Sequence, residues 1–133
     1  MSRRFHYRTM PIFKTVVRVL FAAFFVFAGV SHFTNRDFFI AIVPPYLPWP
    51  ELLVYISGVA EILFGGMLMF RQTARLAGWG LIALLIAVFP ANLHMAMNSG
   101  LYPAISPTAL WIRLPLQGVL IALVYWLARP AAR

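Results

Sequence analysis

The stretch ARLAGWGLIALLIAVFPANLHMAMN, residues 74–98, is apolar over nearly its whole length, with a formally charged side chain only at Arg75. A helix needs about 20 such residues to cross the hydrocarbon core of a bilayer, where every backbone polar group must be paired within the segment. This stretch therefore predicts a transmembrane helix. Similar apolar runs at about 12–33, 50–70 and 107–128 predict an all-α fold, a four-transmembrane-helix bundle formed by one domain over residues 1–133.

The composition of the chain agrees with a membrane location. Hydrophobic residues make up 62% of its 133 residues and the mean hydropathy is +0.84, more than a soluble domain of this size carries. The net charge of +8 does not indicate nucleic-acid binding, because most of the basic residues flank the apolar runs and form no patch of their own. The chain has no cysteine, so it forms no disulfide and no thiolate metal site.

Breaks between the apolar runs contain residues that end helices. The proline-rich stretch 43–50 cannot continue a helix, because proline lacks the backbone donor and its ring clashes with the preceding turn. Thr73, after Arg71 and Gln72, is a candidate N-cap for the third helix. The third break is the Asn-Ser-Gly sequence at 98–100, which two prolines follow closely.

The distribution of Lys and Arg predicts the orientation in the membrane. The N-terminal segment, the 71–75 turn and the C-terminal tail are basic, whereas the loop at 34–49 is nearly neutral and the loop at 99–107 has no charge. By the positive-inside rule both termini lie in the cytoplasm, as in a multi-pass protein of the bacterial inner membrane. A cleavable signal peptide is the alternative reading of the start. It is disfavoured because three remaining spans would leave the basic C-terminus outside.

Polar side chains inside the spans are the candidate functional residues. Glu61 lies ~16 Å along the second helix, near the bilayer middle, where an acid is costly. Arg113 and Gln117 share one face of the fourth helix. The six candidate ligand-binding residues lie in the outer half of the bundle: His32, Glu61, Asn92, His94, Arg113 and Gln117.

The orientation of two of these candidates is open. Asn92 and His94 differ by about 200° of helical rotation, so both point inward only if Pro90 distorts the helix. Together with aromatic neighbours such as Phe33 and Trp111, the polar cluster predicts a pocket open to the outside. The alternative is a purely structural cluster that holds the helices in register.

Signatures of other chemistry are weak. His94, Met95 and Met97 carry soft ligand atoms, but the two methionines point to different sides of a helix, so no metal site is expected. No nucleophile with its base, no phosphate loop and no paired carboxylates are visible. The sequence therefore does not decide whether the protein is an enzyme.

Several short segments together resemble the small bacterial DoxX-like membrane proteins. They are GVSHF (29–33), PPYLP (44–48), YISGVAEI (55–62), FPAN (89–92) and LWIRLPLQ (110–117), in this order over nearly the whole chain. The resemblance implies a four-helix membrane protein, and some relatives are associated with quinone-linked sulfur oxidation or with maturation of redox enzymes. The cysteines used by some redox-maturation relatives are missing here.

Two function classes follow from these residues. The first is an accessory subunit that binds a quinone or other small amphipathic molecule in the outer-leaflet pocket and supports a partner redox enzyme, with Glu61, Arg113 and a histidine contacting a carbonyl. The second is a membrane assembly factor or scaffold whose polar cluster is structural. A transporter ranks third, because no inverted repeat is visible.

Two structural expectations accompany the pocket. The loop from Pro44 to Pro50 is expected to cover its outer mouth as a rigid lid, because closely spaced prolines restrict the backbone. Glu61 and Arg113 are expected to pair, directly or through a water or Gln117, because an unpaired charge in the membrane is the costlier alternative.

Overall fold

The computed structural model describes residues 2–129, and within this range the side chains from residue 12 onward. This part of the chain consists of helices and the turns that connect them, as predicted. In chain order the elements are α1 (Ser2–Thr34), α2 (Arg36–Ala41), α3 (Pro50–Leu68), α4 (Ala74–Met97), the 3₁₀ turn η1 (Ser99–Leu101) and α5 (Pro107–Ala128).

Four of these helices are long and apolar enough to cross a membrane. The apolar spans are Ile12–Thr34, Pro50–Leu68, Ala74–Met97 and Pro107–Ala128, so the number of predicted spans and their approximate ends are confirmed. Two elements differ from the prediction. α1 begins at Ser2, well before the apolar run, and a short helix, α2, occupies part of the expected loop. Asp37 lies in the first turn of α2, where a negative charge favours the helix N-terminus.

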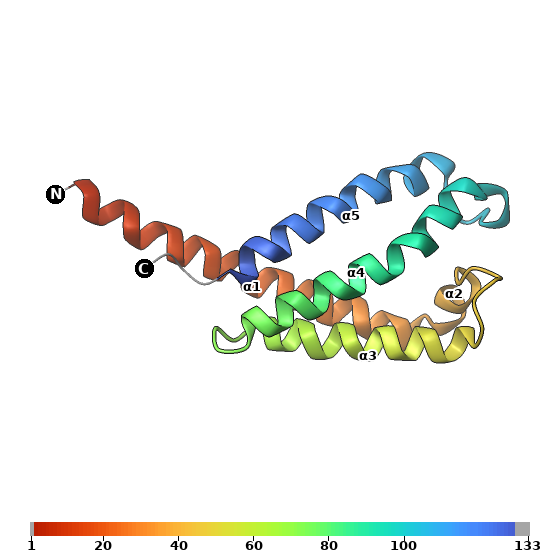
Figure 1. The fold of residues 1–133 in the computed structure, drawn as a ribbon, viewed down its shortest axis with the longest axis horizontal. Coiled ribbons are helices and arrows are strands. Elements are labelled where there is room, and N and C mark those ends of the chain that lie inside the picture. The colour runs from red at the N-terminus through yellow and green to blue at the C-terminus, as the bar shows by residue number, and fades with distance from the viewer. Residues whose placement is uncertain (1, 130–133) are drawn as a thin grey trace.

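The helices are arranged as two hairpins that splay apart at one end (Figure 1). α1 packs along α3, α3 against α4, and α4 along α5, whereas α1 and α5 meet at only a few positions. We call the end with the chain termini and the α3–α4 turn the terminal end. The opposite end, formed by residues 35–49 and 98–106, is the cap end. Because α5 packs on α4, the side chains on its inner face contact α4 more than α3.

The buried apolar side chains form two clusters along the bundle. The larger one joins α1, α3, α4 and α5 toward the terminal end and contains Ala22, Phe25, Leu68, Ala74, Ala77, Leu81, Ile82 and Val124. The smaller one lies at the cap end and contains Met95, Ala96, Tyr102 and Leu110. Burial of these side chains, together with close packing, holds the hairpins together where the clusters lie.

Glycines allow α1 and α3 to approach closely. A Cβ atom added at Gly29 would lie 2.8 Å from the Gly58 carbonyl oxygen and 2.9 Å from the Ile62 backbone nitrogen. These are backbone atoms of α3, which cannot move aside as a flexible side chain would. Membrane helices use small residues at such positions because close van der Waals contact drives their association.

Gly29→Ala is expected to destabilise the protein by about 1–3 kcal/mol, because the added methyl group forces α1 away from α3. Thermal unfolding followed by tryptophan fluorescence measures this. Gly118→Ala on α5 is the matched control: nothing lies within 4 Å of its added Cβ, and alanine is the better helix former. Equal unfolding temperatures for the two variants would contradict the close-packing role.

Side-chain hydroxyls pair backbone groups at two helix ends, and the Thr73 hydroxyl bonds a different helix from the one predicted. Thr73 occupies the N-cap position of α4, but its side chain makes no cap bond there. Its hydroxyl instead donates to the carbonyl oxygen of Met67, at 2.5 Å, and so pairs a carbonyl in the last turn of α3. Ser106 does cap α5, accepting from the Ala109 backbone nitrogen at 3.2 Å, and Pro107 begins the helix.

Candidate ligand-binding site

A cavity of about 500 Å³ lies between the two hairpins, toward the cap end. All five α-helices contribute to its lining, which is mostly apolar. Phe25 and Leu81, members of the larger buried cluster, form part of the wall, and Met95 of the smaller cluster forms another part. The polar side chains in the lining are His32, Ser57, Glu61, Asn92 and Arg113.

The polar wall formed by α1 and α3 is centred on an ion pair. Nε2 of His32 lies 3.2 Å from Oε2 of Glu61, and their side chains are 14% and 15% exposed. On the other side of the ring, Nδ1 lies 3.2 Å from the Val54 carbonyl oxygen and 3.1 Å from Oγ of Ser57. The Ser57 hydroxyl itself donates to Val54 at 3.0 Å.

This arrangement assigns the protons of the pair. The Val54 carbonyl only accepts, and Ser57 has used its hydroxyl hydrogen on that carbonyl, so Nδ1 of His32 must be the donor. The bond between Nε2 and Glu61 then holds one proton, which either the imidazole or the carboxylate can carry. The α1–α3 wall can therefore hold a proton next to the cavity.

The polar wall formed by α4 and α5 is a hydrogen-bonded chain. Nδ2 of Asn92 donates to Oε1 of Gln117 at 2.6 Å, and Nη2 of Arg113 donates to Oδ1 of Asn92 at 3.4 Å. Gln117 is buried, 4% exposed, and its amide also donates to the Leu85 carbonyl. Gln117 holds the Asn92 amide by this hydrogen bond but does not itself line the cavity.

Glu61 and Arg113 do not form the expected direct ion pair in the described part of the chain, and Gln117 does not join them. Glu61 pairs with His32 on the neighbouring helix α1. Arg113 reaches Asn92 because α5 packs on α4. Both charges line the same cavity, on different walls.

His94 lies outside the cavity lining, whereas Asn92 lies in it. Nδ1 of His94 is 3.3 Å from the Tyr102 hydroxyl, and its ring meets that of Tyr46 edge-on at 5.3 Å. Burial, followed by the influence of Tyr46, raises the pKa of Tyr102 above its usual value. The hydroxyl therefore keeps its proton at neutral pH. His94 ties the two connecting segments of the cap end together.

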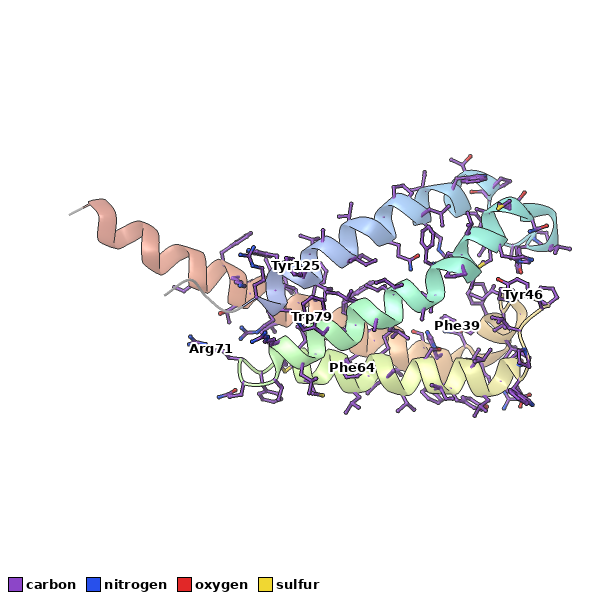
Figure 2. All side chains as sticks on the ribbon, viewed as in Figure 1. Phe39, Tyr46, Phe64, Arg71, Trp79 and Tyr125 are labelled. Carbon is purple, nitrogen blue, oxygen red and sulfur yellow. The ribbon has the colours of Figure 1, made fainter. Side chains whose placement is uncertain are left out.

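The cover of the cavity comes from residues before the proline run as well as from the run itself. Pro44 is fully buried, and Leu47 lines the cavity together with Phe39 and Ile42 of the α2 region. Trp49, in the same run, is 72% exposed. Figure 2 shows Phe39 and Tyr46 at the cap end of the bundle.

Sequence reasoning missed two side chains of the site that contact His32. Ser57 lies one helical turn before Glu61, so the spacing shows that the two side chains share a face of the helix. Phe39, whose ring centre is 4.2 Å from that of His32, could not be found, because its position depends on α2 folding back. The expected aromatic neighbours Phe33 and Trp111 do not line the cavity; they are 41% and 51% exposed.

Residues 21–128 match the family model described as Domain of unknown function (DUF8561). The chain belongs to this family. The DUF8561 region includes every side chain that lines the cavity, from Phe25 on α1 to Arg113 on α5. No curated protein and no solved structure matched the chain.

Proposed function

We propose that this protein is an accessory protein of the bacterial inner membrane that binds a quinone or another small amphipathic molecule and supports a partner redox enzyme. The observation that carries the proposal is the cavity, which combines an apolar lining with polar groups on two walls. Its volume of about 500 Å³ lies in the range of small-molecule sites, about 300–1,000 Å³. The resemblance to DoxX-like proteins agrees with a quinone-linked role.

Access to the cavity favours a ligand that arrives from the bilayer. Ile56 and Leu53 on α3 line the cavity and are 57% and 36% exposed. Ala87 on α4 also lines it and is exposed. These residues belong to spans apolar enough for the membrane interior, where their exposed surfaces face lipid. An apolar tail can pass between α3 and α4 while the polar head group reaches the interior walls.

The two walls offer complementary chemistry to a quinone-like head group. Arg113 is a permanent donor for a carbonyl oxygen. The bond between His32 and Glu61 holds a proton that a reduced carbonyl can accept. In this proposal the partner redox enzyme supplies the electrons, and the role of these residues is to bind the head group and to hold its protons.

A cavity-filling variant tests the binding role. Native mass spectrometry of the purified protein with decylbenzoquinone is expected to show one bound molecule. Ala91→Trp, which fills the cavity, is expected to weaken binding by at least about tenfold, the effect of losing ~1.4 kcal/mol of binding free energy. Ala83→Trp is the control, because Ala83 lies on the same helix but is exposed and outside the lining. Equal binding to both variants would contradict the assignment of the site.

A membrane assembly factor or scaffold is the second candidate. It is favoured by Gln117, which is buried and bonded to α4 at two points, as expected of a side chain that holds helices together. A wild-type protein that stays in a stable partner complex but retains no quinone would favour this candidate over the first.

The orientation that goes with this proposal places both termini in the cytoplasm, in accord with the cations at the terminal end. Because the chain has no cysteine, single cysteines report on topology without background. Gly100→Cys at the cap end is expected to react with a membrane-impermeant maleimide on intact bacterial cells whose outer membrane has been opened. Gln72→Cys, at the α3–α4 turn, should react only after the inner membrane is permeabilised. The reverse pattern would invert the topology.

A further inference from the structure

We infer that the terminal end of the bundle binds the phosphate group of an anionic phospholipid, between α1 and the end of α5. Three cationic residues meet there: Lys14 and Arg18 on α1, and Arg129 directly after α5. Nζ of Lys14 donates to the Arg129 carbonyl oxygen at 2.9 Å and lies 5.7 Å from the centre of the Trp126 ring. These contacts bring Lys14 of α1 to the residues at the end of α5, and Arg18 follows Lys14 by one helical turn. The guanidinium of Arg129 lies over the Tyr125 ring, 5.7 Å from its centre.

No acidic side chain pairs with these cations among the described residues. Lys14 and Arg18 are one helical turn apart, where like charges destabilise a helix. The chain has three acidic residues: Asp37 in α2, Glu51 in the first turn of α3, and Glu61, which pairs with His32. Residues outside the described part, and those of α1 before residue 12, include no acidic side chain either. An anionic ligand from outside the protein can therefore supply the compensating charge.

Arg18 carries a second sign of a missing ligand. Its Nε atom is buried and has no hydrogen-bond partner in the described structure. A buried donor of a charged group that lacks a partner is costly. A guanidinium binds phosphate oxygens through paired, charge-assisted hydrogen bonds, and a change of the Arg18 rotamer would let Nε join such a pair.

The surroundings favour a phospholipid as the source of the phosphate. Ile12 and Phe13, next to Lys14, are apolar and each 63% exposed. The Phe13 ring lies 6.3 Å from that of Trp126. Trp79 and Tyr125 also meet near the terminal end, edge-on at 5.8 Å (Figure 2), as aromatic side chains do at membrane interfaces. A phosphate held by the cations would thus have apolar surface beside it for its acyl chains.

Native mass spectrometry of the delipidated full-length protein tests the site, with phosphatidylglycerol, phosphatidylcholine and inorganic phosphate as separate probes. Phosphatidylglycerol is expected to bind more tightly than phosphatidylcholine. The double variant Lys14→Gln/Arg18→Gln should weaken phosphatidylglycerol binding about thirtyfold, since each cation near an anionic lipid contributes roughly tenfold or less. Arg18→Lys, which keeps the charge but lacks the guanidinium, should show an intermediate loss. Circular dichroism confirms that each variant is folded.

The control variant is Arg71→Gln/Arg75→Gln, which removes the same charge from the α3–α4 side of the terminal end. It should leave phosphatidylglycerol binding within about threefold of wild type, as expected of exposed charges with weak, screened effects. Equal losses of phosphatidylglycerol affinity in the two double variants would indicate non-specific electrostatic attraction and would overturn the proposed site. Binding of inorganic phosphate without phosphatidylglycerol would overturn the lipid assignment.

Discussion

Arg113→Met is expected to make the protein more stable and to remove most of its affinity for an amphipathic ligand. Arg113 lines the cavity, partly buried, and its hydrogen bond to neutral Asn92 is long, at 3.4 Å. No carboxylate in the described structure lies within ion-pair distance of it. Replacing a buried ion pair with apolar side chains of similar volume is often neutral or stabilising by about 1–4 kcal/mol. Because Arg113 has no ion-pair attraction to lose, a gain of that order is expected for Arg113→Met.

The same substitution removes the strongest donor of the site. Hydrogen bonds to charged groups contribute about 1.5–3 kcal/mol, so decylbenzoquinone binding should weaken by about ten- to a hundredfold. Tryptophan fluorescence during thermal unfolding and native mass spectrometry measure the two effects on one preparation. Arg71→Met, at the exposed α3–α4 turn, should change neither. A loss of stability in Arg113→Met would show that the guanidinium is structural, which would favour the scaffold.

His32→Leu is expected to destabilise the protein more than Glu61→Gln does. Removal of His32 leaves the Glu61 carboxylate, 15% exposed, without its partner in an apolar cavity. Breaking a buried pair from one side costs about 3–5 kcal/mol in soluble proteins. Removal of the charge of Glu61 leaves no charged group without a partner, because a neutral His32 keeps its Nδ1 bond to Val54. Glu61→Gln should therefore lower the free energy of unfolding by only about 1 kcal/mol.

The double variant His32→Leu/Glu61→Leu separates pairing from packing. It should recover much of the stability lost in His32→Leu, because no charge is then left unpaired, while ligand binding stays impaired. His94→Leu is the control for loss of a histidine that has no acidic partner. Thermal unfolding of the wild-type protein and of these four variants measures the differences. Losses from His32→Leu and Glu61→Gln of equal size would rule out the stranded-charge explanation.

Together these variants separate a binding cavity from a structural cluster. Residues that only hold helices together should lower stability when removed, as expected for Gln117, which is buried and fully engaged. Arg113 is expected to do the opposite. A side chain that costs stability but faces a cavity is explained by what it binds, because binding sites commonly retain groups that are unfavourable for folding.

The sequence by itself determined the four spans and the depth of the polar residues within them. Hydropathy and length decide whether a segment can cross a bilayer, and both are local properties. Depth follows from counting residues along a helix. For this reason His32, Glu61, Asn92 and Arg113 could be assigned to one half of the bundle, and the structure places all four in one cavity.

Only the tertiary structure decided which of these side chains meet. Glu61 pairs with His32, and not with Arg113, because close packing at Gly29 brings α1 onto α3 while α5 packs on α4. Asn92 faces the cavity and His94 the cap end for the same reason: the rotation of α4 about its axis is set by its neighbours. Helix order and rotation depend on contacts between segments far apart in the chain, and a local pattern of residues does not contain them.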